Sequence, residues 1–278
     1  MPKRVVGKKS KNVKTESVSG FDIIGSAAIL KLQKNTTSAQ ANRIAVEVMK
    51  KNKHLDRVFK KIGKISGTER IPRLVWIRGK KSSLVTHREN GCLFQVDIKK
   101  VFFTPRLSSE RLRIFKIVKP NENVLDMFCG VGPYSILIAK KVKSVYAIDI
   151  NPRASELLKI NMALNKSKNV IPLNGDARKI TKKLKLKFDR IIMNFPLSAQ
   201  DFLDSALSVA SDLCVIHLYS FLDTREGYES ALDNKKATIL ASINKGFRVD
   251  GIRAMPAGET APYVIRECFD ISLSKIKR

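Results

Sequence analysis

The sequence has few of the residues that build metal sites and disulfide frameworks. Its four cysteines share no CxxC spacing, and its three histidines are equally dispersed; they are Cys92, Cys129, Cys214, Cys268, His54, His87 and His217. Zinc sites and disulfide scaffolds depend on close, regular spacing of these residue types. We therefore expect neither a bound metal nor a disulfide framework.

Long apolar runs are also missing. No stretch is long enough to span a bilayer, and the N-terminus lacks the apolar core of a signal peptide. Residues 1–17 instead form a Lys-rich polar tail, whose composition predicts disorder in the free protein. The sequence thus predicts a cytoplasmic protein that does not enter the membrane.

Acidic residues are too few to balance the basic ones. Among 278 residues, 53 Lys+Arg face 25 Asp+Glu, which gives a formal net charge of +28. A field this positive attracts polyanions. A thermophilic origin or a lysine-rich proteome is the alternative, but it usually raises Glu together with Lys. Residues 1–108 hold 25 of the basic residues and only 7 of the acidic ones, so we expect this part to contact nucleic acid.

The first part of the chain predicts a small α+β domain. Residues 21–32 are typical of a strand and a turn, and residues 73–79 of a strand. Asn-Gly within residues 89–91 lies between two alternating runs and predicts a hairpin. A helix is predicted over residues 38–51, with Thr36 or Thr37 as N-cap and with one apolar face formed by Ala41, Ile44, Ala45 and Val48.

The second part alternates strand-like and helical stretches. Strands are predicted at residues 124–128, 144–149, 169–175, 188–194 and 213–220, with helices near 134–142, 152–165, 198–211 and 223–244. This βαβ alternation predicts a parallel sheet with both faces covered. Two further strand-like runs, 246–255 and 263–273, are separated only by a stretch containing Pro256, Gly258 and Pro262, which leaves no room for a helix. We therefore expect an antiparallel pair at the end of a seven-stranded sheet, similar to the Rossmann-like class I methyltransferase fold.

A glycine turn follows the first of these strands. Gly130 and Gly132 allow a tight turn and a close approach of a ligand to the backbone. Asp126 lies near the strand's carboxyl end, and Asp149 ends the next strand, 19 residues after Gly130. An acidic residue in that place can accept hydrogen bonds from ribose hydroxyls. Asp176 follows the third strand and would meet an adenine amino group.

These residues favour S-adenosylmethionine as the cofactor. An ordinary strand–helix turn would explain the two glycines alone, but three acidic residues at three consecutive strand ends are harder to dismiss. A dinucleotide site calls for a third glycine where this sequence has Ser135. Asn151-Pro152 then begins a helix with an N-cap followed by proline.

The fourth strand ends in Asn194-Phe195-Pro196-Leu197. This run resembles the (Asp/Asn)-Pro-Pro-aromatic motif of nucleic-acid amino methyltransferases, with Phe in the second place. An amide both donates and accepts, so Asn194 can read the edge of a base. The alternative is a strand end followed by a helix-breaking proline.

The runs 89–114, 126–136, 147–166 and 191–207, with Phe21–Leu30 near the start, together resemble the archaeal and eukaryotic tRNA guanine-37 N1-methyltransferase family. The resemblance covers about residues 18–278. The sequence also resembles a sister family, which transfers an aminocarboxypropyl group in wybutosine synthesis. That family typically lacks the NxP motif, which this sequence has. Many archaeal members carry an additional N-terminal domain that checks the tRNA elbow, and we expect this chain to be a short member without it.

The resemblance implies roles for individual residues. Glu110 corresponds to the proposed general base, Arg70 to the arginine that stabilises the target guanine, and Asn194 would lie near that guanine. The implied cofactor contacts are Phe103, Arg106, Asp126, Gly130, Gly132, Asp149, Ile150, Asn151, Asp176, Ala177, Asn194 and Pro196. Without the resemblance, Glu110 could pair with Arg106 or Arg113 on a helix surface, and Arg70 could contact a phosphate.

These observations combine into one expectation. We expect a monomer with a tail (1–17), an RNA-binding domain (18–108) and a methyltransferase domain (109–278). It would bind the anticodon arm of tRNA and methylate N1 of guanosine 37; methylation of a wyosine precursor, which some archaeal relatives carry out, is an additional activity that the resemblance leaves open. The rivals are an aminocarboxypropyl transferase, a non-catalytic basic RNA-binding protein and a DNA methyltransferase. The last ranks low because the basic domain has no obvious major-groove helix.

Overall fold

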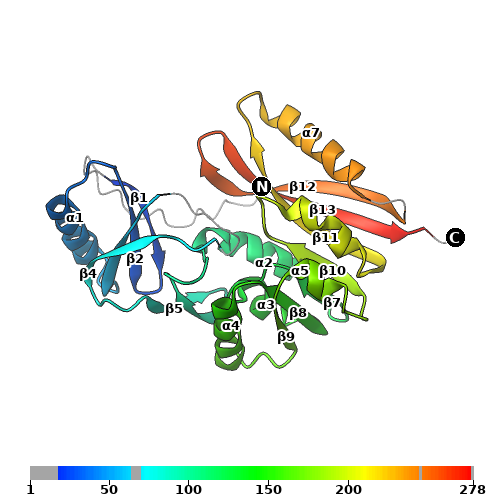
Figure 1. Cartoon of the computed structure of the whole chain (residues 1–278), viewed down its shortest axis with the longest axis horizontal. Coiled ribbons are helices and arrows are strands. Elements are labelled where there is room, and N and C mark those ends of the chain that lie inside the picture. The colour runs from blue at the N-terminus through cyan, green and yellow to red at the C-terminus, as the bar shows by residue number, and fades with distance from the viewer. Residues whose placement is uncertain (1–17, 64–69, 244–245, 277–278) are drawn as a thin grey trace, which may run out of the picture.

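The computed structural model describes residues 18–63, 70–243 and 246–276. Figure 1 shows a small sheet with one helix beside a larger sheet flanked by helices. The predicted tail over residues 1–17 lies outside the described residues. No helix within the described ranges is long and apolar enough to cross a membrane.

The small unit is a four-stranded sheet with one crossover helix. Its elements are β1 (Val18–Ile24), β2 (Ala27–Leu32), α1 (Ser38–Lys51), β3 (Arg57–Lys61) and β4 (Leu74–Gly79), and its strand order is β1-β2-β3-β4. Strands β2 and β3 are parallel because α1 connects them, whereas the other pairs are antiparallel. The sequence prediction omitted β3, whose five residues are too short for a clear alternating pattern.

Helix α1 confirms the predicted bounds and cap. The Gln40 amide N–H donates to the Thr37 hydroxyl over 3.2 Å, and the Thr37 amide N–H donates to the Gln40 side-chain oxygen over 2.8 Å. This capping box satisfies two amides that would otherwise lack partners. The predicted apolar face is buried against β2 and β3, in a cluster that includes Ile44, Val48, Leu30 and Val58.

A separate hairpin connects the two units. It consists of β5 (Leu84–Glu89) and β6 (Cys92–Asp97), and its turn places Asn90 and Gly91 at positive φ, as predicted. Buried residues of the hairpin share one core with the inner face of the small sheet and with the larger unit. The predicted domain boundary between residues 108 and 109 stays a prediction.

The large sheet has the order β12-β13-β11-β10-β7-β8-β9. Its strands are β7 (Asn123–Asp126), β8 (Ser144–Asp149), β9 (Val170–Asn174), β10 (Phe188–Met193), β11 (Ala210–Asp223), β12 (Phe247–Ala261) and β13 (Val264–Lys275). Strands β7 to β11 are mutually parallel, and β12 and β13 form an antiparallel pair beside β11. The predicted seven-stranded methyltransferase sheet is therefore confirmed.

Helices cover both faces of this sheet because successive strand residues point to opposite sides. Val124 and Ile192 face one core, whereas their neighbours Leu125 and Ile191 face the other. The first face carries α2 (Ser108–Ile117), α3 (Pro133–Ile138) and α4 (Pro152–Leu164), and the second carries α5 (Ala177–Thr181), α6 (Leu203–Leu207) and α7 (Tyr228–Ala241).

Two local predictions were wrong. The stretch predicted as a helix over 198–211 is a 3-10 turn (Ala199–Phe202) followed by the short α6, and β11 already begins at Ala210. Strand β12 does not end before Pro256 but continues to Ala261 through irregular register. A proline is tolerated there because β12 is an edge strand, where an amide need not pair within the sheet.

Candidate active site

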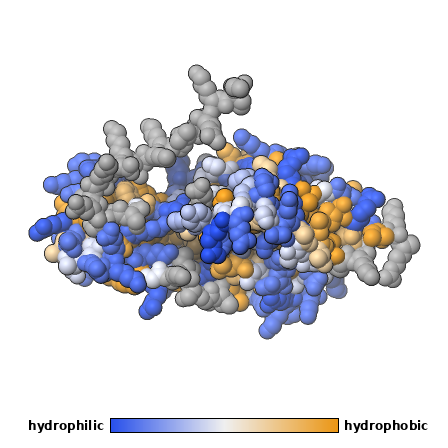
Figure 2. Space-filling view, turned by 90° about the horizontal axis from the view of Figure 1, so that it is seen from above, coloured by the Kyte–Doolittle hydropathy of each residue, from blue (hydrophilic) through white to orange (hydrophobic). Residues whose placement is uncertain are grey.

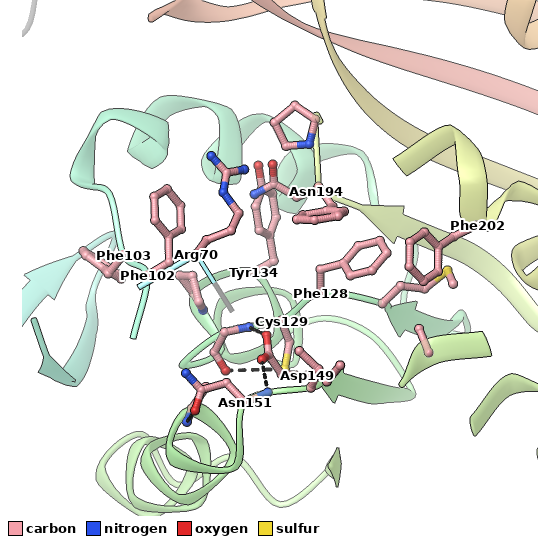
Figure 3. A pocket seen from close by; sticks show the side chains of 18 of the residues that line it. Arg70, Phe102, Phe103, Phe128, Cys129, Tyr134, Asp149, Asn151, Asn194 and Phe202 are labelled. Carbon is pink, nitrogen blue, oxygen red and sulfur yellow. Dashed lines mark hydrogen bonds between the residues drawn. The ribbon is translucent and has the colours of Figure 1, made fainter. Parts of the chain in front are cut away.

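A cavity of about 210 Å³ lies at the carboxyl ends of β7, β8, β9 and β10. Carboxyl ends of parallel strands meet at one edge of a sheet, so residues far apart in sequence converge there. Of the predicted site residues, ten line this cavity: Arg70, Phe103, Gly130, Asp149, Ile150, Asn151, Asp176, Ala177, Asn194 and Pro196. Figure 3 shows this convergence.

The glycine turn and Asp149 are tied together by hydrogen bonds. The Gly130 amide N–H donates to Asp149 Oδ2 over 2.7 Å, and the Asn151 amide N–H donates to Asp149 Oδ1 over 2.9 Å (Figure 3). Gly130 has φ 55°, a left-handed conformation that disfavours other residues. A carboxylate offers roughly four acceptor sites, so Asp149 can also accept from a ligand hydroxyl.

Asp126 and Gly132 support this turn from behind and do not line the cavity. The Asp126 side chain is fully buried and accepts a 2.7 Å hydrogen bond from the Ser135 hydroxyl. Burial raises the pKa of Asp126 to about 7. A Cβ on Gly132 would lie 2.4 Å from Leu158 Cδ1. The structure therefore gives these two predicted contact residues a supporting position instead.

An aromatic wall closes one side of the cavity, and the sequence prediction missed it. The Phe128 ring lies 5.2 Å from that of Phe195 and 5.0 Å from that of Phe202. Arg178 places its guanidinium 3.9 Å from the Phe202 ring centroid. Asp176 caps the helix that carries Arg178 and accepts from its amide over 2.8 Å. A flat apolar wall beside acidic acceptors suits a purine nucleoside.

Arg70 and Asn194 come from distant segments but extend to the same side of the cavity (Figure 3). The Arg70 guanidinium lies 4.9 Å from the Phe102 ring centroid and 5.9 Å from that of Phe195. Its backbone has φ 52°, and its Nε has no hydrogen-bond partner among the described residues. Burial lowers the pKa of Arg70. An incoming acceptor would satisfy this nitrogen.

Glu110 lies behind the cavity wall, not in it. Arg113 donates two hydrogen bonds of 2.7 and 2.8 Å to its carboxylate. The ion pair with Arg113 that the sequence offered as an alternative therefore exists, but Glu110 is buried and not on the helix surface. The Tyr219 hydroxyl donates to Glu110 Oε1 over 2.6 Å, and the Tyr134 hydroxyl donates to that of Tyr219 over 3.0 Å. Because Tyr134 lines the cavity, these two hydroxyls connect Glu110 to it.

Of two arginines near the start of α2, the predicted Arg106 does not line the cavity and the unpredicted Arg111 does. Arg106 does not line the first cavity; it pairs with Asp22 of β1 over 2.6 Å and lines a neighbouring second cavity. Arg111 lines the first cavity and forms a bidentate pair with Glu89, with hydrogen bonds of 2.5 and 2.6 Å. Nothing in the sequence marked Arg111 apart from its place within the family motif.

One histidine and one cysteine lie closer together than their sequence spacing suggested. Single ligand atoms of His217, Cys268 and Asp270 lie within 4.8 Å of one another. His217 is fully buried, with Nδ1 2.5 Å from Asp270 Oδ1 and Nε2 2.6 Å from Arg190. Arg113 also pairs with Asp270 over 2.5 Å. Two guanidinium groups thus occupy the surroundings in which a cation would have to sit.

The sheet order, the glycine turn and the acidic residue that ends β8 define a Rossmann-like methyltransferase fold. Comparison of the sequence with known protein families then identifies the family within this fold. The chain belongs to the TRM5/TYW2 methyltransferase family: residues 85–242 match the TRM5/TYW2 methyltransferase domain. Residues 3–82 match the TYW2 N-terminal domain.

The similar proteins include methyltransferases that are named for different substrates. The tRNA (guanine(37)-N(1))-methyltransferase Trm5b of Pyrococcus abyssi is 44% identical over 203 residues, which are 73% of this chain and 60% of that enzyme. Its crystal structure has a TM-score of 0.81 at 38% identity and covers 92% of this chain and 75% of the solved one. The tRNA 4-demethylwyosine(37)-methyltransferase Taw21 of Saccharolobus solfataricus is 35% identical, over 74% of this chain and 79% of that protein.

A relative with a different reaction is also close. The tRNA(Phe) (4-demethylwyosine(37)-C(7)) aminocarboxypropyltransferase of Methanocaldococcus jannaschii is 37% identical over 174 residues, 62% of this chain and 69% of that enzyme. The chain spans about 60% of the length of the Pyrococcus Trm5b that it matches.

Proposed function

We propose that this chain transfers a methyl group from S-adenosylmethionine to N1 of guanosine at position 37 of tRNA. The observation that carries the proposal is the convergence of Arg70 and Asn194 on the cavity that also contains Asp149. The similarity to Trm5b, a tRNA (guanine(37)-N(1))-methyltransferase, supports the same reaction. The net charge of +28 supports a polyanionic substrate.

The cavity fits the proposed cofactor. Asp149, fixed by two backbone amides, would accept hydrogen bonds from the ribose hydroxyls. Ile150, Asn151, Asp176 and Ala177 would enclose the adenosine beside the aromatic wall. When bound, the cofactor supplies an electrophilic methyl group on a sulfonium.

The opposite side of the cavity would hold the guanine. Asn194 offers an amide that can both donate to and accept from a base edge, and Pro196 follows it along the wall. Guanine N1 carries a proton and becomes a good nucleophile only when that proton leaves. Negative charge then develops on O6, where the half-buried Arg70 guanidinium can stabilise it.

We assign the proton to Glu110 through the two tyrosines. Tyr134 accepts the N1 proton while its own passes to Tyr219, and the Tyr219 proton passes to the Glu110 carboxylate. Burial raises the pKa of both tyrosines, so neither holds negative charge and the proton ends on the carboxylate. Arg113 keeps Glu110 oriented toward Tyr219 throughout.

Aminocarboxypropyl transfer is the second candidate. Two observations favour it: residues 3–82 match the TYW2 N-terminal domain, and the Methanocaldococcus transferase is 37% identical. The retained Asn194-x-Pro196 sequence argues for methyl transfer, because the sister family typically lacks it. Arg70 beside Asn194 also suits an N1 target better than a ring carbon.

Product analysis separates these candidates. The chain is incubated with the cofactor and two tRNA substrates, an unmodified transcript and one that carries the wyosine precursor. Mass spectrometry of the digested nucleosides should show 1-methylguanosine from the transcript. An aminocarboxypropyl adduct on the precursor, with no methylated guanosine, would overturn the proposal in favour of the second candidate.

A further inference from the structure

Arg266 is a buried cation that has no acidic partner in the part of the chain that the structure describes. It lies on β13 opposite Phe221 of β11, with 7% of its surface exposed, and its guanidinium lies 5.4 Å from the Phe221 ring centroid. Among the described residues, Arg266 forms no ion pair, and its Nε has no hydrogen-bond partner. Buried charges in proteins are normally paired, so an unpaired one calls for an explanation.

Arg266 lines two adjoining cavities. The first is the candidate active site, and the second lies between the small sheet, the segment before α2 and the far end of β12. Both cavities share five lining residues: Arg70, Phe102, Phe103, Thr104 and Arg266. A chain-like ligand could therefore pass from one cavity to the other alongside the two arginines.

The second cavity is rich in positive charge. It is lined by Lys31 and Lys61 in addition to Arg70, Arg106 and Arg266. Asp22 is its one acidic lining residue with a described side chain, and it is paired with Arg106. Burial and the nearby charge of Lys31 lower the pKa of Lys61. Burial also lowers the pKa of Arg266, and Arg70 lies close enough to lower it further.

We propose that Arg266 binds the phosphate of the nucleotide whose base enters the first cavity beside Arg70, and that Lys31 and Lys61 contact the RNA backbone along the second cavity. A guanidinium binds phosphate through two parallel hydrogen bonds, which would satisfy the unpaired Nε of Arg266. An entering phosphate would also offset the mutual repulsion of the two guanidinium groups.

A nucleic acid fits these cations better than the cofactor's carboxylate does. The adenosine-binding residues Asp149 and Asp176 line only the first cavity, whereas Lys31 and Lys61 line only the second. A single carboxylate could not reach along both. Two other arginines line the first cavity. Arg111 is already neutralised by its bidentate pair with Glu89, and the Arg178 guanidinium lies against the Phe202 ring.

Binding measurements on Arg266→Gln test this inference, which depends on the proposed function only in taking RNA as the ligand. The matched control is Arg248→Gln, an exposed arginine at the other end of the same hairpin that pairs with Asp250. We expect Arg266→Gln to weaken binding of a tRNA transcript about tenfold and to lower the salt slope by about one. Arg248→Gln should bind like the wild type, and neither variant should change the affinity for S-adenosylmethionine measured by calorimetry.

A second probe isolates the phosphate. Wild-type protein should bind guanosine 5′-monophosphate more tightly than guanosine, and Arg266→Gln should lose this difference while Arg266→Lys keeps part of it. Unchanged RNA affinity and salt slope in Arg266→Gln would overturn the proposal, and reduced cofactor affinity alone would assign the arginine to the carboxylate. A wild type that binds tRNA but does not methylate it would contradict the proposed function and leave this test intact.

Discussion

The Glu110 side chain has two proposed roles: it forms buried hydrogen bonds, and it accepts the proton of the reaction. Its carboxylate accepts hydrogen bonds from Arg113 and Tyr219, and Tyr219 connects it to the cavity through Tyr134. We expect Glu110→Gln to slow single-turnover methyl transfer about 100-fold, because an amide cannot take up the N1 proton. Tight binding of tRNA and cofactor should persist.

Two tyrosine variants provide the matching controls. Tyr134→Phe and Tyr219→Phe each remove one hydroxyl from the connection and should slow the same step while the Glu110 carboxyl group is kept. A single-turnover rate that is unchanged in Glu110→Gln would refute its role as base. Normal rates in both tyrosine variants, with a slow Glu110→Gln, would show that the carboxylate reaches the guanine directly.

The raised pKa of Asp126 predicts that the stability of the fold depends on pH. Its pKa rises from 3.8 in the unfolded chain to about 7 in the fold because it is fully buried. Between these values the folded state holds a proton that the unfolded state has lost, so this carboxyl destabilises the fold as pH rises. Asp126→Asn removes that effect. As pH rises through this window, the free energy of unfolding of the variant should therefore increase relative to that of the wild type, by up to about 1.4 kcal/mol per pH unit. Urea unfolding at several pH values measures it; a constant difference would contradict the assignment.

Among the elements, the hairpin β5–β6 depends on two asparagines of α4. The Gln95 amide donates to the Asn161 side chain over 2.6 Å, and the Leu93 amide donates to that of Asn165 over 2.9 Å. Asn161 is fully buried and also donates to the Val131 carbonyl over 2.9 Å. It thereby connects the hairpin to the glycine turn of the cavity.

Removing this connection should cost stability. Asn161→Ala leaves the Gln95 amide and the Val131 carbonyl without their partner, and we expect a loss of about 1–3 kcal/mol in the free energy of unfolding. Urea unfolding measures it, with Lys159→Ala, an exposed residue of the same helix, as control. Equal losses in the two variants would show that the buried asparagine contributes nothing specific.

At the scale of elements, the sequence predicted what depends on local pattern. The strand ends with Asp149, Asp176 and Asn194 could be placed because acidic and amide residues follow apolar runs. The division of residues 198–211 into a 3-10 turn, the short α6 and the start of β11 could not, because it depends on tertiary contacts such as that of Phe202 with Phe128. Neither could Arg266, which lies in an ordinary strand-like run and reaches the cavity only through the sheet order.

At the scale of the whole molecule, charge should dominate RNA binding. With a net charge of +28, the logarithm of tRNA affinity should fall steeply and linearly with the logarithm of salt concentration. Filter binding between low and physiological salt measures this slope, and a flat response would contradict the charge argument. Figure 2 shows hydrophilic residues over much of one face, with hydrophobic residues between them.

The basic tail over residues 1–17, which lies outside the described residues, adds to this charge. Its deletion should weaken tRNA binding and lower the salt slope because fewer phosphates are neutralised. Cofactor affinity should not change, since the cavity is built from residue 70 onward. Equal tRNA affinity with and without residues 1–17 would show that the tail is dispensable.

Labelled cofactor tests whether the chain transfers a methyl group to guanosine 37. Two tRNA transcripts that differ only in guanosine or adenosine at position 37 are incubated with the enzyme and S-adenosylmethionine labelled in the methyl group. We expect labelled 1-methylguanosine from the first transcript and none from the second. Equal labelling of both transcripts, or label in neither, would contradict it.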